Sequence, residues 1–139
     1  MSVKVFLDTN IFIYMRSSEA DKKEISCRAL NSFECVVSTQ VLNEFCSVAL
    51  KKLALDTSLI RQVIHAINNT CEIAVVTLET VEKALWIQER YELAYYDSLI
   101  VASALENDCT YLLTEDMGDG QIIESKMEIV NIFARPGFI

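Results

Sequence analysis

Residues 3–10 read Val-Lys-Val-Phe-Leu-Asp-Thr-Asn, an apolar run that ends in an aspartate and two short polar residues. A second run, Tyr111-Leu112-Leu113-Thr114, is followed by Asp116. Short apolar runs of this kind are typical of strands that are buried on both faces of a parallel sheet. Open α/β sheets bind ligands at the carboxyl ends of their strands. Asp8 and Asp116 are therefore predicted to lie at a functional edge.

The rest of the chain alternates between helical and strand-like patterns. This alternation favours an α/β fold with three layers (α/β/α) and a largely parallel central sheet. At 139 residues, without a linker or an internal repeat, residues 1–139 are predicted to form a single domain. A short helix is expected to begin at Ile11, and a second helix to end at about Asn31. Further helices are expected to begin at Ser38 or Thr39 and at Asp56, and to cover 79–91 and 96–106. Further strands are expected at 35–37, 73–76 and 128–133.

The composition excludes several classes of protein. Apolar residues make up 52% of the chain, with three glycines and one proline, which leaves little room for disordered linkers. No apolar stretch reaches the roughly 20 residues that span a bilayer, and the N-terminus lacks a signal-peptide pattern, so we expect a cytoplasmic protein without membrane contact. Five cysteines without a C-x-x-C pair are expected to be buried apolar residues in a reducing compartment, not a zinc site.

The net charge of −8 argues against binding of nucleic acid through a broad basic surface. It does not exclude nucleic acid, because divalent cations bound to a cluster of acids make the cluster locally positive. Crowded carboxylates repel one another unless a cation neutralises them, and their oxygens suit a hard divalent metal. The candidates for such a cluster are Asp8, Glu44, Asp97 and Asp116.

Three of these acids also have a purely structural interpretation. Asp8 can be a turn or capping residue, although Asn10 is the better cap for a helix that begins at Ile11 and leaves Asp8 free. Glu44 lies at the flank of its helix's apolar stripe, where it can reach water or point into a cleft. Asp97 begins an apolar helix, where an aspartate satisfies free amides and the helix dipole, but where a buried helix also holds a metal ligand rigidly.

The loop after the late strand is densely acidic. Asp116 lies in Thr114-Glu115-Asp116-Met117-Gly118-Asp119-Gly120, which contains two of the three glycines. Those glycines indicate unusual backbone angles or a close approach to another group. A surface turn would look similar, but the density of acids favours function, and Asp119 is a possible fifth carboxylate.

The four acids and the residues around them, taken in their order and spacing, resemble the PIN-domain family of metal-dependent ribonucleases. The resemblance covers about residues 3–133, and the size and compactness of the chain look like the VapC-type toxins of bacterial toxin–antitoxin pairs. The matching stretches are Val-Phe-Leu-Asp-Thr-Asn (5–10), Ser-Thr-Gln-Val-Leu-Asn-Glu (38–44), Tyr-Asp-Ser-Leu-Ile-Val-Ala-Ser-Ala (96–104) and Leu-Leu-Thr-Glu-Asp-Met (112–117).

The resemblance implies an activity and a set of roles. PIN domains hold Mg²⁺ or Mn²⁺ with an acidic quartet and hydrolyse phosphodiester bonds in RNA. The implied metal and catalytic residues are Asp8, Glu44, Asp97 and Asp116. The implied orienting residues around them are Thr9, Asn10 and Thr114, and Asp119 is implied as an aid to a second metal ion. A toxin of this type also implies an RNA substrate, an antitoxin that covers the cleft, and a homodimer.

Basic residues near the first two acids are weaker candidates for RNA contacts. Such groups can grip a phosphate backbone, but a solvated face explains them equally well. Tyr14, Tyr95 and Tyr96 can stack on bases, although core packing is a better explanation for at least one of them. The basic candidates are Arg16, Lys22, Lys23 and Lys51.

Other functions fit the sequence less well. Phosphatases of this fold class have a second aspartate where this chain has Asn10. Both phosphatases and receiver domains have a lysine near a later strand end, and Thr114-Glu115-Asp116 contains none. A serine or cysteine hydrolase lacks its base, because His65 is the only histidine and lies in mid-helix, where we expect it at the surface. The remaining alternatives are a PIN-type module that binds RNA or protein without cutting, and a housekeeping RNA-processing nuclease.

Overall fold

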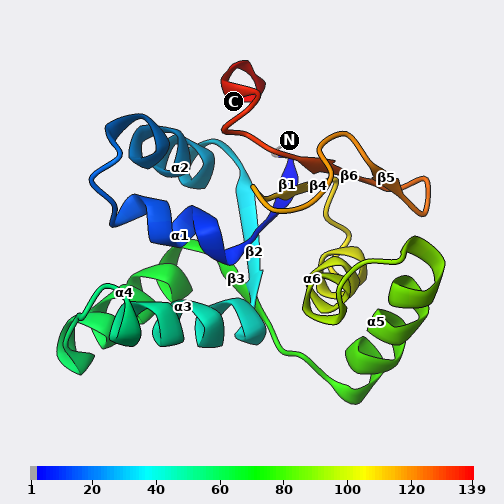
Figure 1. Cartoon of the computed structure of the whole chain (residues 1–139), viewed down its shortest axis with the longest axis horizontal. Coiled ribbons are helices and arrows are strands. Elements are labelled where there is room, and N and C mark those ends of the chain that lie inside the picture. The colour runs from blue at the N-terminus through cyan, green and yellow to red at the C-terminus, as the bar shows by residue number, and fades with distance from the viewer. Residues whose placement is uncertain (1–2) are drawn as a thin grey trace.

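The computed structural model describes residues 3–139 and confirms the predicted three-layer architecture (Figure 1). Six strands in this range form one sheet in the order β3-β2-β1-β4-β6-β5. All pairings are parallel except that of β5 with β6. The strands are β1 (Lys4–Leu7), β2 (Glu34–Ser38), β3 (Glu72–Ala74), β4 (Tyr111–Leu113), β5 (Ile122–Ile123) and β6 (Met127–Val130).

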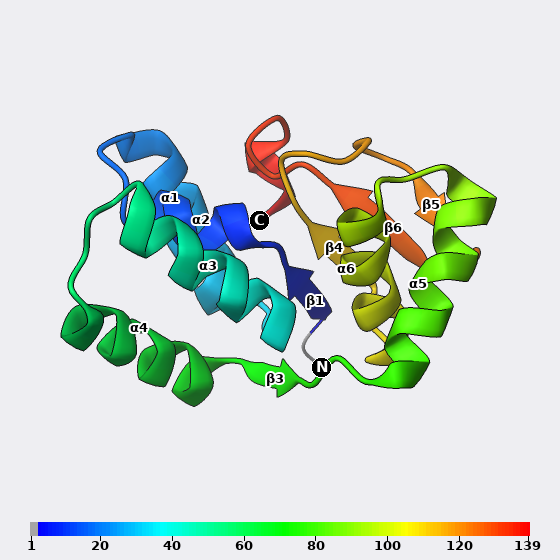
Figure 2. The same ribbon diagram turned by 60° about the horizontal axis from the view of Figure 1, so that its bottom comes forward.

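Helices cover both faces of the sheet. On one side lie α1 (Thr9–Met15), α2 (Ala20–Ser32), α3 (Thr39–Lys51) and α4 (Thr57–Thr70), and on the other α5 (Leu78–Tyr91) and α6 (Tyr95–Glu106) (Figure 1). A short 3₁₀ turn, Pro136–Phe138, follows near the C-terminus. When the molecule is turned, α3 and α6 are seen on opposite sides of β1 (Figure 2).

The core explains why the central elements are rigid. Val5, Phe6 and Leu7 of β1 have no exposed surface, as expected for a strand that is covered on both faces. Helix α6 is buried from Ser98 to Ala104, because its residues are apolar or small on every side. Cys35, Cys71 and Cys109 are buried free thiols, while His65 is exposed on α4.

Three strands end earlier than predicted, β4 by a single residue at Leu113, and one strand was missed. The strand expected at 128–133 stops at Val130, because the Asn131 side chain accepts hydrogen bonds from the backbone of Phe133 and Ala134 and turns the chain. The strand expected at 73–76 stops at Ala74, and the Val76 amide donates to the Thr39 hydroxyl instead. With only two residues, β5 is too short for a recognisable alternation.

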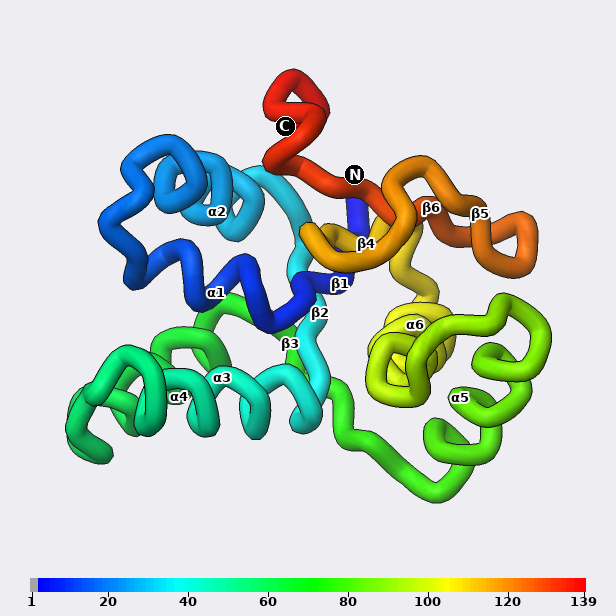
Figure 3. Tube along the Cα trace, viewed as in Figure 1, coloured from blue at the N-terminus to red at the C-terminus, as the bar shows by residue number. Residues whose placement is uncertain are grey.

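The topology brings distant segments together at one edge. Strands β1 and β4 are neighbours in parallel register, so their carboxyl ends lie side by side. The trace in Figure 3 shows the loop after β4 passing beside β1 before it turns towards β5. No helix within residues 3–139 has the length and apolar character to cross a membrane.

Candidate active site

Asp8 lies at the end of β1 and caps α1. Its Oδ1 accepts a hydrogen bond from the backbone N–H of Thr9 (2.7 Å), and its Oδ2 accepts one from Thr114 Oγ1 (2.8 Å). The prediction that Asn10 caps a helix beginning at Ile11 is wrong. The chain turns directly after β1, and the Ile11 N–H donates to the Asp8 carbonyl (3.1 Å), so the helix begins at Thr9.

The surroundings of Asp8 disfavour its charge. The residue is only 6% exposed. Burial raises its pKa to about 6, against the hydrogen bonds from Thr114 and Thr9, and the negative charges of Glu44 and Asp116 raise it further. A buried carboxylate with acidic neighbours is the environment that a bound cation relieves.

Glu44 is held from two sides by neutral donors. Its Oε2 accepts a hydrogen bond from Thr9 Oγ1 (2.8 Å), and its Oε1 accepts one from Gln40 Nε2 (2.8 Å). Ser38 caps α3 through its side chain, as one of the two predicted caps. The half-buried Glu44 therefore points towards Thr9, beside Asp8, and not freely into water.

Asp97 is the third residue of α6 but does not cap it. The N-cap is Ala94, which makes no side-chain capping bond, and the Asp97 carboxylate forms no hydrogen bond with any residue from 3 to 139. Burial raises the pKa of Asp97, with further contributions from the charges of Asp116 and Glu44. The capping explanation for this aspartate is thus not realised, and its oxygens stay unpaired on a rigid helix.

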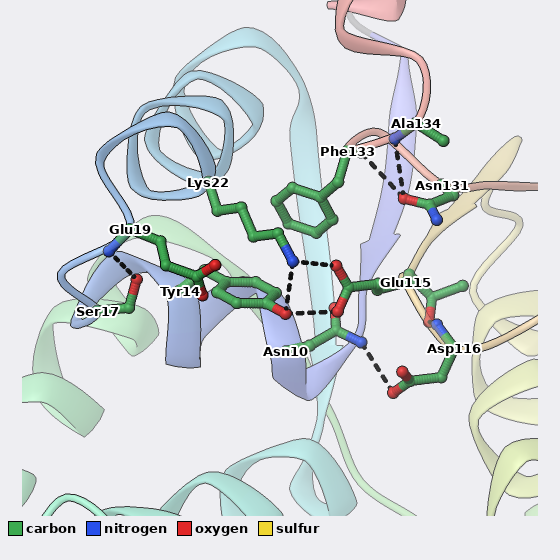
Figure 4. A network of polar contacts seen from close by, with 11 residues as sticks. Asn10, Tyr14, Ser17, Glu19, Lys22, Glu115, Asp116, Asn131, Phe133 and Ala134 are labelled. Atoms are coloured by element: carbon green, nitrogen blue, oxygen red, sulfur yellow. Dashed lines mark hydrogen bonds and ion pairs between the residues drawn. The ribbon is translucent and has the colours of Figure 1, made fainter.

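Asp116 faces α1 across the site (Figure 4). Its Oδ2 accepts a hydrogen bond from Asn10 Nδ2 (3.1 Å), and its backbone N–H donates to Thr114 Oγ1 (3.2 Å). Asn10 Oδ1 is buried without a partner among residues 3–139. The side chains of Thr9, Asn10 and Thr114 thus each donate to one carboxylate of the cluster.

The four acids converge without a cationic partner. Thr9 contacts both Asp8 and Glu44, and Thr114 contacts both Asp8 and the backbone of Asp116, so these three acids lie side by side. The charges of Asp116 and Glu44 also raise the pKa of Asp97. No salt bridge within residues 3–139 involves any of the four. In the same range, no group of three or more Asp, Glu, His or Cys side chains is placed so that all could ligate one metal ion. Mg²⁺ keeps several waters and needs only one or two direct carboxylates, so the donor set fits that ion.

Asp119 does not join this cluster. Its Oδ1 accepts hydrogen bonds from the backbone of Asn131 (2.8 Å) and from Arg135 Nη2 (2.8 Å) and Nε (3.1 Å). The hydrogen bond from Asn131, followed by those from Arg135, lowers the pKa of Asp119. These contacts tie the loop to the C-terminal segment, and the expected role of Asp119 beside a second metal stays a prediction. Of the loop glycines, only Gly120 needs its special freedom, with φ of 87°.

The predicted basic residues have different surroundings. Lys22 Nζ forms an ion pair with Glu115 (2.7 Å) and donates to the Tyr14 hydroxyl (3.0 Å), and Tyr14 also donates to Glu115 (Figure 4). Although burial opposes the change, the hydrogen bonds from Lys22 and Tyr14 lower the pKa of Glu115. Lys22 is therefore already paired beside Asp116. The other three, Arg16, Lys23 and Lys51, are exposed.

The sequence interpretation overlooked Gln40. This side chain is buried, binds Glu44, and lies on the wall of a hollow of about 560 Å³ between α3 and α6. Tyr96, which is 67% exposed, lies on the opposite wall. A spacing of four residues on one helix face was the available signal, because side chains at i and i+4 are neighbours.

A family model for the PIN domain matches residues 5–118. The chain belongs to the PIN domain family. This PIN domain has no match among curated proteins. The matched range contains all four clustered acids.

Solved structures with the same fold include several toxin–antitoxin proteins. A toxin–antitoxin complex from Klebsiella pneumoniae has 22% identity and a TM-score of 0.68, over 91% of this chain and 96% of that one. VapC20 of Mycobacterium tuberculosis, a sarcin-ricin loop cleaving toxin, has 16% identity and a TM-score of 0.64, over 78% and 86%. VapBC2 from Rickettsia felis, bound to promoter DNA, has 16% identity and a TM-score of 0.65, over 93% and 98%. At these identities the likeness shows the fold alone.

Proposed function

We propose that this PIN domain is a metal-dependent endoribonuclease and the toxin of a VapBC-type pair. The observation that carries the proposal is the convergence of four carboxylates at the carboxyl edge of the sheet, with a raised pKa at Asp8 and Asp97 and no cationic partner among the described residues. Such an arrangement is unfavourable in a protein that does not bind a cation there.

The chain's own residues suit Mg²⁺ or Mn²⁺. Asp97, whose oxygens make no hydrogen bond to residues 3–139, and Asp8 are the direct ligands that we propose, with Glu44 and Asp116 completing the acidic set. Thr9, Asn10 and Thr114 hold these carboxylates in place. When bound, such a cation lowers the pKa of water and neutralises charge on phosphate oxygens during phosphodiester hydrolysis.

The substrate and partners follow from the same proposal. RNA would approach along the hollow between α3 and α6, where the exposed Tyr96 can stack on a base. The solved structures of similar fold include complexes of toxins with antitoxins, which supports an antitoxin partner for this chain. A homodimer and action in the cytoplasm belong to the same proposal.

A cleavage assay tests the proposal. Purified protein should cut RNA with Mg²⁺ or Mn²⁺ and stop in excess chelator, and Asp97→Asn should be inactive but folded. Cleavage that continues undiminished in chelator would contradict the metal-dependent mechanism. Metal-bound wild type that leaves every tested RNA intact would favour a binding module without catalysis.

Expression in bacteria separates a toxin from a housekeeping nuclease. Growth arrest that the small neighbouring gene product relieves is expected for a toxin. Normal growth at full expression of active enzyme would favour an RNA-processing role.

A further inference from the structure

Gln40 joins the two helices that carry Glu44 and Asp97. Its Nε2 donates to Glu44 Oε1 (2.8 Å) on its own helix and to the backbone carbonyl of Tyr96 (3.1 Å) on α6. Tyr96 directly precedes Asp97 in the sequence. One amide nitrogen thus links two acids that come from opposite faces of the sheet.

The orientation of the Gln40 amide is determined by its partners. Both groups that face the nitrogen are acceptors, a carboxylate oxygen and a carbonyl oxygen, so the flipped amide would place its own oxygen against them. The observed orientation leaves Gln40 Oε1 buried without a partner among residues 3–139.

This arrangement is poor for packing alone. Gln40 is 8% exposed, and an unpaired acceptor at such a position opposes folding. Methionine has a similar length and would fill the space without that penalty. An amide here is explained by its two donated hydrogen bonds, which fix the position of Glu44 against α6.

The donors around Glu44 also leave it without a cationic partner. Thr9 holds Oε2 and Gln40 holds Oε1, and both donors are neutral, so no cationic side chain of the described residues competes for the carboxylate. A glutamate side chain has three rotatable bonds, and holding both oxygens keeps it in one orientation towards Asp8 and Asp97.

We propose that Gln40 is a positioning residue that sets the separation of Glu44 and Asp97 for a shared divalent cation. This inference rests on the proposed function, because it needs the acidic cluster to bind metal. In this proposal Gln40 acts on the cation through Glu44 and is not itself a ligand. Mutation of a residue that holds a metal ligand in place commonly lowers metal affinity by about 10- to 100-fold.

Mn²⁺ binding by Gln40→Met tests the inference without an activity assay. Free Mn²⁺ is measured by electron paramagnetic resonance in a titration of the full chain with metal alone. We expect Gln40→Met to bind Mn²⁺ about tenfold more weakly or worse, while its melting temperature in chelator stays equal or rises. The matched control is Gln62→Met, the same change at an exposed residue of α4, and it should bind like wild type.

A second measurement keeps the test independent of the folding of the variant. In wild-type protein, the side-chain amide resonances of Gln40 should shift when Mg²⁺ is added, and those of Gln62 should not. Unchanged Gln40 resonances, or equal Mn²⁺ affinity of Gln40→Met and wild type, would overturn the inference alone. Wild type that binds no Mn²⁺ would overturn the proposed function, and this inference with it.

Discussion

Asp116 and Asp119 lie three residues apart in the loop after β4, yet they have opposite surroundings. Asp119 is paired with Arg135 and with the backbone of Asn131, and these contacts lower its pKa. Asp116 has only the neutral amide of Asn10 and lies among three other acids. Asp119 is thus paired with a cationic side chain. Within residues 3–139 the clustered acids have no cationic partner, which leaves them available for an external cation.

Among the substitutions that test this difference, Asp97→Asn should have the largest effect on RNA cleavage. Losing a proposed direct ligand should lower RNA cleavage by about 10³-fold, beyond the 10–100-fold typical of outer-sphere changes. The fold should persist, because Asp97 makes no hydrogen bond to residues 3–139. Initial rates and melting curves check both statements. An active Asp97→Asn variant would remove this residue from the metal site.

The raised pKa of Asp8 predicts how stability depends on pH in chelator. The folded pKa is about 6 and the ordinary value is 3.8, so the folded state binds the proton more tightly. Stability should therefore fall as pH rises from about 3 to 7, by about 3 kcal/mol from this group alone. Urea unfolding of wild type and Asp8→Asn across that range measures the difference. Parallel pH profiles for the two proteins would contradict the raised pKa.

Mg²⁺ should stabilise wild type through the cluster. A concentration of 100 times the dissociation constant raises the free energy of unfolding by about 2.7 kcal/mol. Asp97→Asn should lose most of this gain, whereas Asp119→Asn should keep it. Equal gains in all three proteins would place the metal elsewhere.

Asp119→Asn should have the smallest effect. Its ion pair with Arg135 is largely exposed, so the melting temperature should fall only slightly and RNA cleavage should stay at the wild-type rate. Asp116→Asn serves as the matched comparison in the same loop and should lose cleavage. A large loss of cleavage in Asp119→Asn would restore this residue to the site.

The sequence predicted the fold well because its signals are local. The apolar run before Asp8 and the all-round apolar helix after Asp97 each require burial, whatever their neighbours. The four acids were predicted as a cluster for the same reason: each interrupts or ends an apolar pattern. Thr9, Asn10 and Thr114 contact the carboxylates, and their orienting roles stay a prediction.

The errors have tertiary causes. The Asn10 amide turned out to face Asp116, more than 100 residues away, while Asp8 took the capping role. Lys22 was predicted as a contact for RNA, and in the fold it forms an ion pair with Glu115. Arg135 pairs with Asp119 although it lies 16 positions further along the chain. No local pattern predicts which acid obtains a distant cation, so the sequence could not separate Asp119 from the clustered acids.

Crystals grown with Mn²⁺ and measured at a wavelength where manganese scatters anomalously give the most direct test of metal binding by the four acids. We predict an anomalous peak within coordination distance of Asp8 and Asp97, on the side that faces Glu44 and Asp116. A map without a peak there at saturating Mn²⁺, or with its main peak beside Asp119, would contradict the assignment of this cluster as the metal site.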